Sequence, residues 1–241
     1  MRKTCSICSV NKPITDFYNQ KGGRYGKSAV CKVCLYKKNK ESRERRQKNI
    51  KELPNNLTEE QTESILENFG YRCFLTGNEG IGLDHFVPLS WGSVVMKYGI
   101  GGTTYANMIP LYRSINSSKQ SMNPFIWFER YGERHGVSIE KWNSAVQYIA
   151  EKHDMTSDEY KNRVNACYNE ILALRWITRV NFRIESGESI HYVDIRNALK
   201  MNLNIPVVVE MLGSIETKNA FLDQPTIDLV NQLKARLEKS A

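Results

Sequence analysis

Residues 82–92 read GLDHFVPLSWG, an apolar run that an acid and an imidazole interrupt, Asp84 and His85. The run predicts a buried strand, in which a charge without a partner costs several kcal/mol. One interpretation is a packed histidine beside a solvated aspartate. The other is a site for a metal ion and for proton transfer, and the surrounding sequence bears on the choice.

Composition limits the class of protein. The chain has 241 residues, of which 41% are hydrophobic and 25% charged, as in a folded domain protein. No apolar stretch approaches the roughly 18 residues that span a bilayer, and the first residues lack the apolar segment of a signal peptide. We therefore expect an intracellular, cytoplasmic protein with no membrane partner. Its six cysteines are then metal ligands or free thiols rather than disulfides.

The positive charge is concentrated at the N-terminal end. Residues 1–52 hold 15 Lys or Arg against 4 Asp or Glu, a net charge of +11. The whole chain has a net charge of +8, so the remaining 189 residues carry a net charge of 8 − 11 = −3. A basic segment on a mildly acidic body predicts a polyanionic partner, most often nucleic acid. A solubilising tail is the alternative.

Two Cys-x-x-Cys pairs, Cys5/Cys8 and Cys31/Cys34, are separated by 22 residues. Each pair can direct two thiolates at one ion, and together they supply a closed tetrahedral Zn²⁺ site. A closed set leaves no position for a substrate, so this zinc is expected to be structural and to stabilise a segment too short to fold on its own core. The loop between the pairs, with its glycines and its aromatic and cationic side chains, suits a phosphate backbone without being specific for one.

The elements that follow can be read from helix and strand signals. Residues 35–53 predict an exposed basic helix, either a solvated face or a linker that lies along DNA. A second helix is predicted from Thr58, with Gln61 completing a capping box. Two short apolar runs, around residues 82–92 and 105–111, predict a β-hairpin with a long connection. Helices are predicted over 112–120 and after Pro124.

Beyond residue 133 the pattern is mostly helical. Residues 138–152, 157 to about 177, and 224–239 carry apolar residues at helical spacing. Residues 178–222 are mixed, and Val207–Val209 fit either a strand or a buried helix. Other single residues are expected to be ordinary packed or surface groups: His135, His153, His191, the core thiol Cys167, and the core tryptophans Trp127, Trp142 and Trp176.

The segments LDHFVPLS (83–90) and YANMIPLYRSINSSKQ (105–120) together resemble the HNH endonuclease family. That resemblance implies an α+β protein with a ββα-metal core, in which a β-hairpin and a helix surround one ion. In this family the first strand bears an Asp-His pair, a middle Asn opens the second strand, and a His or Asn lies on the helix. Here these positions are Asp84, His85, Asn107 and Asn116, an H-N-N version.

The resemblance also implies the chemistry, a metal-dependent hydrolysis of DNA phosphodiester bonds that leaves 5′-phosphate and 3′-hydroxyl ends. His85, with an ordinary pKa of about 6.5, suits a general base. Asp84 and Asn116 offer oxygen ligands for Mg²⁺ or Mn²⁺. Asn107 is implied to fix the hairpin and to orient His85 without touching the metal.

Two points test this resemblance. Adjacent residues of a regular strand point to opposite faces, so Asp84 and His85 can share a site only where the strand ends or bulges. In addition, many family members carry a second zinc in the core. Here only Cys73 remains, so we expect no zinc there and instead packing by Phe74, Tyr112 and Ile115.

The resulting hypothesis divides the chain into a zinc module (1–36), a basic helical linker (37–56), the nuclease core (57–132) and a helical region (133–241) that contacts DNA or forms a homodimer. The partner is double-stranded DNA. By the resemblance, the layout favours a phage-type homing or nicking endonuclease, which would act in the cytoplasm of a bacterial or phage-infected cell. There are two alternatives: a restriction or defence nuclease, and a catalytically inactive zinc-containing DNA-binding protein. The expected DNA contacts are Lys37, Lys38, Arg43, Arg45, Arg46, Lys48, Arg113 and Lys119.

Overall fold

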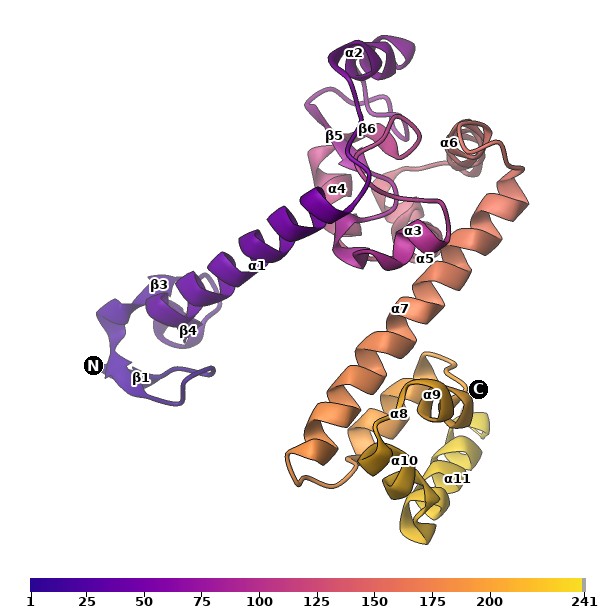
Figure 1. Cartoon of the computed structure of the whole chain (residues 1–241). Helices are drawn as coiled ribbons and strands as arrows, with labels where there is room; N and C mark the ends of the chain where they lie inside the picture. The colour runs from indigo at the N-terminus through magenta and orange to yellow at the C-terminus, as the bar shows by residue number, and fades with distance from the viewer. Residues whose placement is uncertain (240–241) are drawn as a thin grey trace.

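The computed structural model describes residues 1–239 as an α+β chain of many helices and three separate two-stranded sheets (Figure 1). The expected α+β class is therefore confirmed. Within this described part, no helix is both long and apolar enough to cross a membrane.

The N-terminal module is built from two small antiparallel hairpins. Strand β1 (Arg2–Thr4) pairs with β2 (Asn11–Pro13), and β3 (Phe17–Asn19) pairs with β4 (Lys27–Cys31). Short 3₁₀ turns, Ile14–Asp16 and Arg24–Gly26, lie between the strands. Its buried core consists of only Cys5, Phe17 and Cys31. So few apolar contacts cannot hold a segment of this size by themselves.

Helix α1 (Lys32–Glu52) leaves this module as a long arm and carries the chain to the central core (Figure 1). It begins three residues before the expected Leu35, so the boundary placed between residues 36 and 37 falls inside the helix. Its last turns are not a free linker, because Asn49 and Leu53 are buried and the Asn49 Nδ2 donates to Leu89 O at 2.8 Å.

The central core contains the predicted hairpin and helices. Helix α2 (Glu59–Asn68) has the expected Thr58–Gln61 capping box. Strands β5 (Ile81–His85) and β6 (Met108–Tyr112) are antiparallel in continuous register, with Asp84 opposite Ile109 and His85 opposite Met108. Helices α4 (Arg113–Lys119) and α5 (Pro124–Tyr131) follow, the latter with Pro124 in its first turn.

The long connection between β5 and β6 folds back on the core. It contains a 3₁₀ turn (Leu89–Trp91) and the short helix α3 (Val94–Lys97). Its residues Phe86, Val87, Leu89 and Trp91 are buried in the central core, which accounts for the apolar residues around Asp84 and His85. A glycine is required at Gly102, because its φ is +75° and a Cβ would lie 2.5 Å from Pro54 O. The next residue, Thr103, donates its N–H to that same oxygen.

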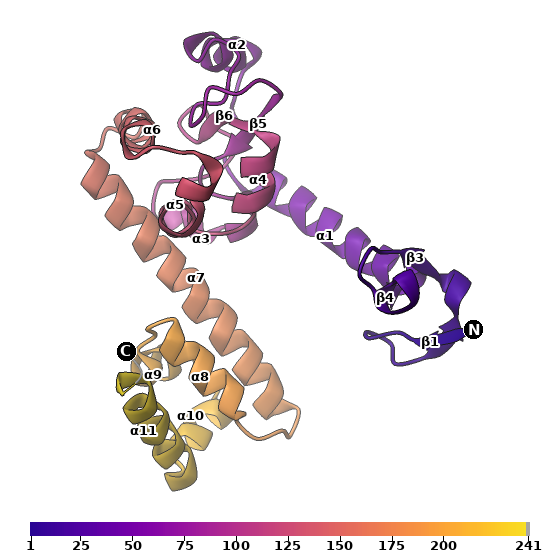
Figure 2. The same ribbon diagram turned by 180° about the vertical axis from the view of Figure 1, so that it is seen from behind.

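The remainder is helical, as expected for 133–241, of which residues 240–241 lie outside the described residues. A 3₁₀ turn (Glu133–His135) and α6 (Ile139–Glu151) lead to the long helix α7 (Ser157–Glu185), which runs to a separate bundle (Figure 2). The bundle comprises α8 (Tyr192–Lys200), α9 (Ile205–Leu212), α10 (Ile215–Leu222) and α11 (Gln224–Glu238).

Two predictions about this region need revision. Helix α7 continues past the expected Ile177 to Glu185, because Val180 is buried with Trp176 in the core of the bundle. Val207–Val209, left open between strand and helix, belong to α9.

The packing predictions are confirmed. Trp127, Trp142, Trp176, Cys167 and Ile115 are buried, and Phe74 and Tyr112 pack against the same central core as Ile115. The single histidines have ordinary structural surroundings: His135 packs on Trp127, His153 on Tyr160, and His191 caps α8.

Candidate functional site

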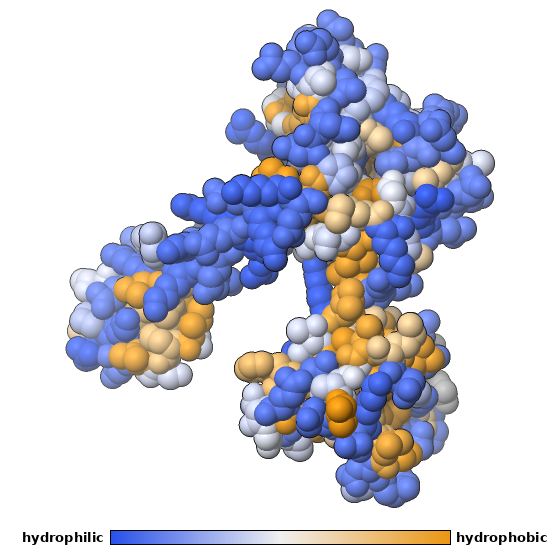
Figure 3. Space-filling view, in the orientation of Figure 1, coloured by the Kyte–Doolittle hydropathy of each residue, from blue (hydrophilic) through white to orange (hydrophobic). Residues whose placement is uncertain are grey.

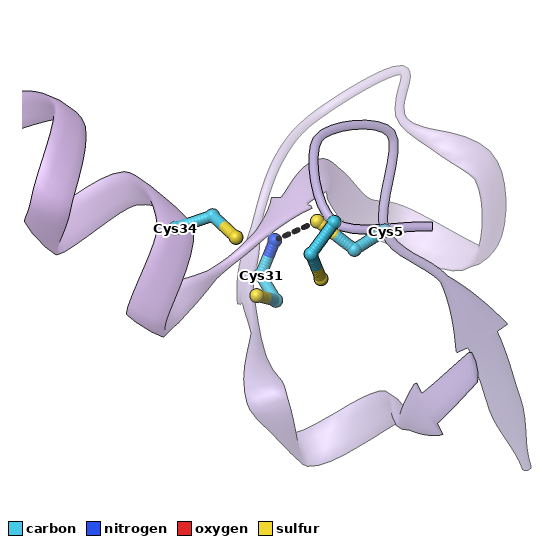
Figure 4. Close-up of side chains that lie close together, drawn as sticks. Cys5, Cys31 and Cys34 are labelled. Atoms are coloured by element: carbon cyan, nitrogen blue, oxygen red, sulfur yellow. Dashed lines mark hydrogen bonds between the residues drawn. The ribbon is translucent and has the colours of Figure 1, made fainter. Parts of the chain in front are cut away.

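Four sulfurs converge in the N-terminal module. Their positions in sequence are Cys5, Cys8, Cys31 and Cys34, and their Sγ atoms all lie within 4.8 Å of one another. Figure 4 shows how Cys31, at the end of β4, and Cys34, in the first turn of α1, face Cys5. Tetrahedral Zn²⁺ with Zn–S bonds of about 2.3 Å needs sulfurs about 3.8 Å apart, so a modest closure of the cluster suffices.

The local electrostatics favour a cation in this cluster. Burial raises the pKa of the Cys5 thiol, but N–H groups of Cys31, Cys8 and Ile7 outweigh it and lower this pKa to about 6. The pKa of Cys34 is raised to about 12, mainly by the neighbouring Cys31. A bound dication lets all four sulfurs be thiolates at once, and this donor set fits a structural zinc ion.

A second set of polar residues lines a hollow of about 300 Å³ at the end of β5. Asp84 and His85 come from the strand, and Asn116 comes from the middle of α4. Strand β5 ends at His85, and both members of the pair line the hollow, as the expected convergence requires. The Asn116 side chain has no hydrogen-bond partner among residues 1–239, so its amide is free to bind a ligand.

Asn107 supports this strand end from behind. It is fully buried; its Nδ2 donates to Val87 O at 3.0 Å and Gly102 O at 2.8 Å, and its Oδ1 accepts from Val87 N at 2.8 Å. Both polar atoms of its side chain thus form hydrogen bonds with main-chain groups, at Val87 and Gly102. It does not line the hollow, in agreement with the positioning role that the resemblance implies.

His85 is held by a residue that the sequence did not indicate. Its Nε2 lies 3.0 Å from the Thr103 Oγ1, which follows the turn at Gly102. Burial, above all, lowers the pKa of His85 to about 4. The nearby Asp84 carboxylate opposes this shift, and the cations Arg46 and Lys119 add to it. The imidazole is therefore neutral at pH 7 and able to accept a proton.

Lys119 corrects a prediction. It was expected to contact a phosphate close to the site, but its side chain is only 4% exposed, and its Nζ lies 2.8 Å from Asp84 Oδ2 and 2.8 Å from His85 O. A buried ammonium needs such partners, and they fix the end of β5 instead of leaving the charge for DNA. The sequence gives no signal for this, because the partners lie 34 and 35 positions away.

Arg46 also belongs to the hollow, although the sequence placed it only among the DNA contacts. The docking of Asn49 on Leu89 brings this exposed side chain of α1 to the rim. The α7 residue Arg175 donates to Ser90 O at 3.1 Å, on the same rim. The charged lining of the hollow thus consists of one carboxylate, Asp84, and the cations Arg46 and Lys119.

The other predicted DNA contacts do not converge on the hollow. Their side chains are exposed, along α1 or at the start of α4, and Figure 3 shows a continuous hydrophilic surface along the arm. Lys48 lies 3.7 Å from Glu52, a weak surface ion pair. The exposed residues concerned are Lys37, Lys38, Arg43, Arg45, Lys48 and Arg113.

The donor types around Asp84 fit a hard divalent cation. The Oδ2 atom of Asp84 is buried and accepts no hydrogen bond, so its partner among the described residues is the Lys119 ion pair alone. A Mg²⁺ or Mn²⁺ ion held by Asp84 and Asn116 would share the carboxylate with this ammonium. Comparison with models of protein families, with curated proteins and with solved structures finds no match to the chain.

Proposed function

We propose that this protein is a metal-dependent endonuclease of the HNH type that cuts double-stranded DNA. The observation that carries the proposal is the hollow at the end of β5, where Asp84, His85 and Asn116 meet from a hairpin and the following helix. A carboxylate, a neutral imidazole and a free amide around one hollow are the groups that metal-assisted phosphodiester hydrolysis needs.

The roles follow from the surroundings of each residue. His85 takes a proton from the attacking water, with its ring held by the Thr103 hydroxyl and its carbonyl oxygen by Lys119. Asn107 holds the neighbouring main chain at Val87 and Gly102. Asp84 and Asn116 would hold Mg²⁺ or Mn²⁺, which when bound stabilises charge on the phosphoryl oxygens. Arg46 offers a cation to a phosphate at the rim. The products are a 5′-phosphate and a 3′-hydroxyl.

DNA is held by the N-terminal module and α1. The four-cysteine cluster fixes the start of α1, and the exposed Lys and Arg residues of this helix face solvent on the way to the hollow. Each phosphate that they neutralise releases counterions, which favours binding without sequence preference. A homing or nicking enzyme, a restriction or defence nuclease, and a homodimer that cuts both strands are all compatible with this arrangement.

A second candidate function has one observation in its favour. The Lys119 ammonium already pairs with Asp84, the single carboxylate of the hollow. If a divalent ion cannot compete with it, the chain is a zinc-containing DNA-binding protein without nuclease activity. The exposed Lys and Arg residues of α1 serve that function equally well.

Incubation with supercoiled plasmid distinguishes the two. We expect nicked or linear product with Mg²⁺ or Mn²⁺, and none when these ions are withheld. Withholding them is a better control than a chelator, because a chelator also removes ions from the cysteine cluster. Plasmid that is bound but stays supercoiled with every divalent ion tried would contradict the nuclease and support the second candidate.

A further inference from the structure

The N-terminal module carries charge that nothing within it neutralises. Residues 1–39 contain nine Lys or Arg and one acidic residue, Asp16. No ion pair forms within this segment among the described residues, whereas pairs occur further along the chain. A Zn²⁺ ion with four thiolates would remove only two of these positive charges. The excess therefore faces solvent or an anionic partner.

Several of these cations are nevertheless held in place, by neutral groups. Lys3 Nζ donates to Arg24 O at 3.1 Å and to Lys27 O at 2.8 Å. Lys27 Nζ donates to Asn19 Oδ1 at 2.6 Å, and an Arg2 N–H group donates to Asn11 O at 2.6 Å. Carbonyl and amide oxygens orient a cation without cancelling its charge. The side chains are thus ordered and still fully charged before any partner binds.

These cations surround a hollow of about 450 Å³ on one side of the module. It is lined by basic and neutral polar side chains and by no acidic one. The residues that matter here are Arg2, Lys3, Asn11, Gln20, Arg24 and Lys27.

The loop at the edge of this hollow is strained. Tyr25 has φ +60° and ψ +27°, a left-handed conformation that favours glycine, and its side chain is 49% exposed. Neighbouring glycines make the turn possible: a Cβ on Gly23 would lie 2.3 Å from Lys27 O. Strain retained at an exposed aromatic residue is typical of functional positions.

Arg24 and Tyr25 form one unit at this tip. The Arg24 guanidinium lies 4.9 Å from the centre of the Tyr25 ring, and one of its N–H groups donates to the Tyr25 hydroxyl at 3.0 Å. The pairing orders a long cationic side chain that is otherwise exposed. A planar donor group stacked on an aromatic ring is well suited to phosphate oxygens and base edges.

We propose that residues 20–27, led by Arg24 and Tyr25, form a second DNA-contacting site that grips the duplex away from the hollow at Asp84. The proposal rests on the proposed function for its ligand, double-stranded DNA. Between Lys32 and Arg46, helix α1 advances about 21 Å, at about 1.5 Å per residue. That length corresponds to about six base pairs at about 3.4 Å each, and we place the contact of the tip at about this distance from the bond cut at the hollow.

The test is a pair of substitutions measured on two duplexes. Tyr25→Gly removes the strain together with the ring, and Arg24→Gln removes the charge. Affinity is measured without Mg²⁺ on one duplex that extends about 4 base pairs beyond the cut bond toward the module and on one that extends about 15. We expect each variant to bind the long duplex at least about tenfold more weakly than the wild type, with little change on the short one. Arg24→Gln should also lower the slope of log affinity against log salt by about 0.9.

Folding of the variants is checked independently. Tyr25→Gly should leave the zinc content at one ion per chain and the melting temperature unchanged or raised, because glycine adopts the left-handed conformation without strain. Ser9→Gly is the matched control, since Ser9 also has a positive φ, of +54°, but does not line the hollow. Arg196→Gln, at an exposed arginine of the distant helical bundle, controls for charge.

Wild-type affinity of both tip variants on the long duplex, with zinc retained, would overturn the proposal. Equal losses on the long and short duplexes would overturn the placement of the tip at a distance from the cut. These outcomes are separate from the nuclease test. If the chain never cuts, no cut bond exists to place the short duplex, but the loss of affinity on any long duplex still tests the tip. That result would contradict only the proposed activity.

Discussion

The two candidate ligand sets of this chain are constructed in opposite ways. The cysteine cluster places four sulfurs within 4.8 Å of one another. A cation, Lys12, lies beside Cys31, and a hydrogen bond with that sulfur raises the pKa of the lysine. The hollow at the end of β5 contains one carboxylate, Asp84, and a buried cation, Lys119, already paired with it. The four thiolates of the first set therefore need an added cation, whereas the carboxylate of the second set is already paired with a cation of the chain, Lys119.

The largest expected effect is that of removing zinc. A chelator should unfold residues 1–31 and leave the rest folded, because structural zinc contributes about 10–16 kcal/mol in small zinc domains and the module has only three buried core residues. All four tryptophans, Trp91, Trp127, Trp142 and Trp176, lie outside the module, so their fluorescence reports on the remainder alone. We expect rapid proteolysis within residues 1–31 with unchanged tryptophan emission. A joint loss of both signals would contradict the comparison.

Breaking the internal ion pair should have the next largest effect. Lys119→Met leaves the Asp84 carboxylate uncompensated beside a buried strand end, and such changes cost about 3–5 kcal/mol. The same substitution at the cluster, Lys12→Met, should leave urea unfolding of the core unchanged. Adding Asp84→Asn to Lys119→Met should restore part of the loss, since no unpaired charge then remains. Equal unfolding midpoints for the two lysine variants would show that the pair does not stabilise the core.

The pH dependence of the core is expected to be smaller. The pKa of His85 is about 4 in the folded chain, because of burial, against about 6.5 when unfolded. The unfolded chain binds the proton first, so the stability contributed at pH 7 is lost as the pH falls from about 6.5 to about 4. The free energy of unfolding lost in this way should reach about 3 kcal/mol. It is measured by urea unfolding of the wild type and of His85→Gln, followed by tryptophan fluorescence, as the difference between the two proteins. If the stability of both proteins fell equally as the pH is lowered, the effect could not be assigned to His85.

The two sets also differ in how far the sequence alone could identify them. The cysteine ligands follow from spacing, because each pair forms one local turn. The Thr58 cap and the helix after Pro124 likewise depend on residues near in sequence. Thr103 and the inward turn of Lys119 depend instead on contacts 18 to 35 positions away, which no local pattern contains. The end of α7 was missed for the same reason, since the bundle buries its last turns.

The smallest effect provides a baseline for the others. Thr58→Ala removes the capping box of α2, which touches neither ligand set, and should cost about 1 kcal/mol of stability. Zinc content and DNA affinity should not change, as measured by metal analysis and a binding titration. A drop in zinc content here would mean that the module and the core do not unfold independently.

We propose that the hollow at the end of β5 cuts DNA and that the basic arm holds it. The decisive measurement compares cleavage and binding by His85→Ala with those of the wild type on one duplex. We expect at least a hundredfold slower cleavage, the lower range for loss of a general base, with the dissociation constant unchanged within about twofold. Cleavage at the wild-type rate, or an affinity that falls as much as the rate, would contradict it.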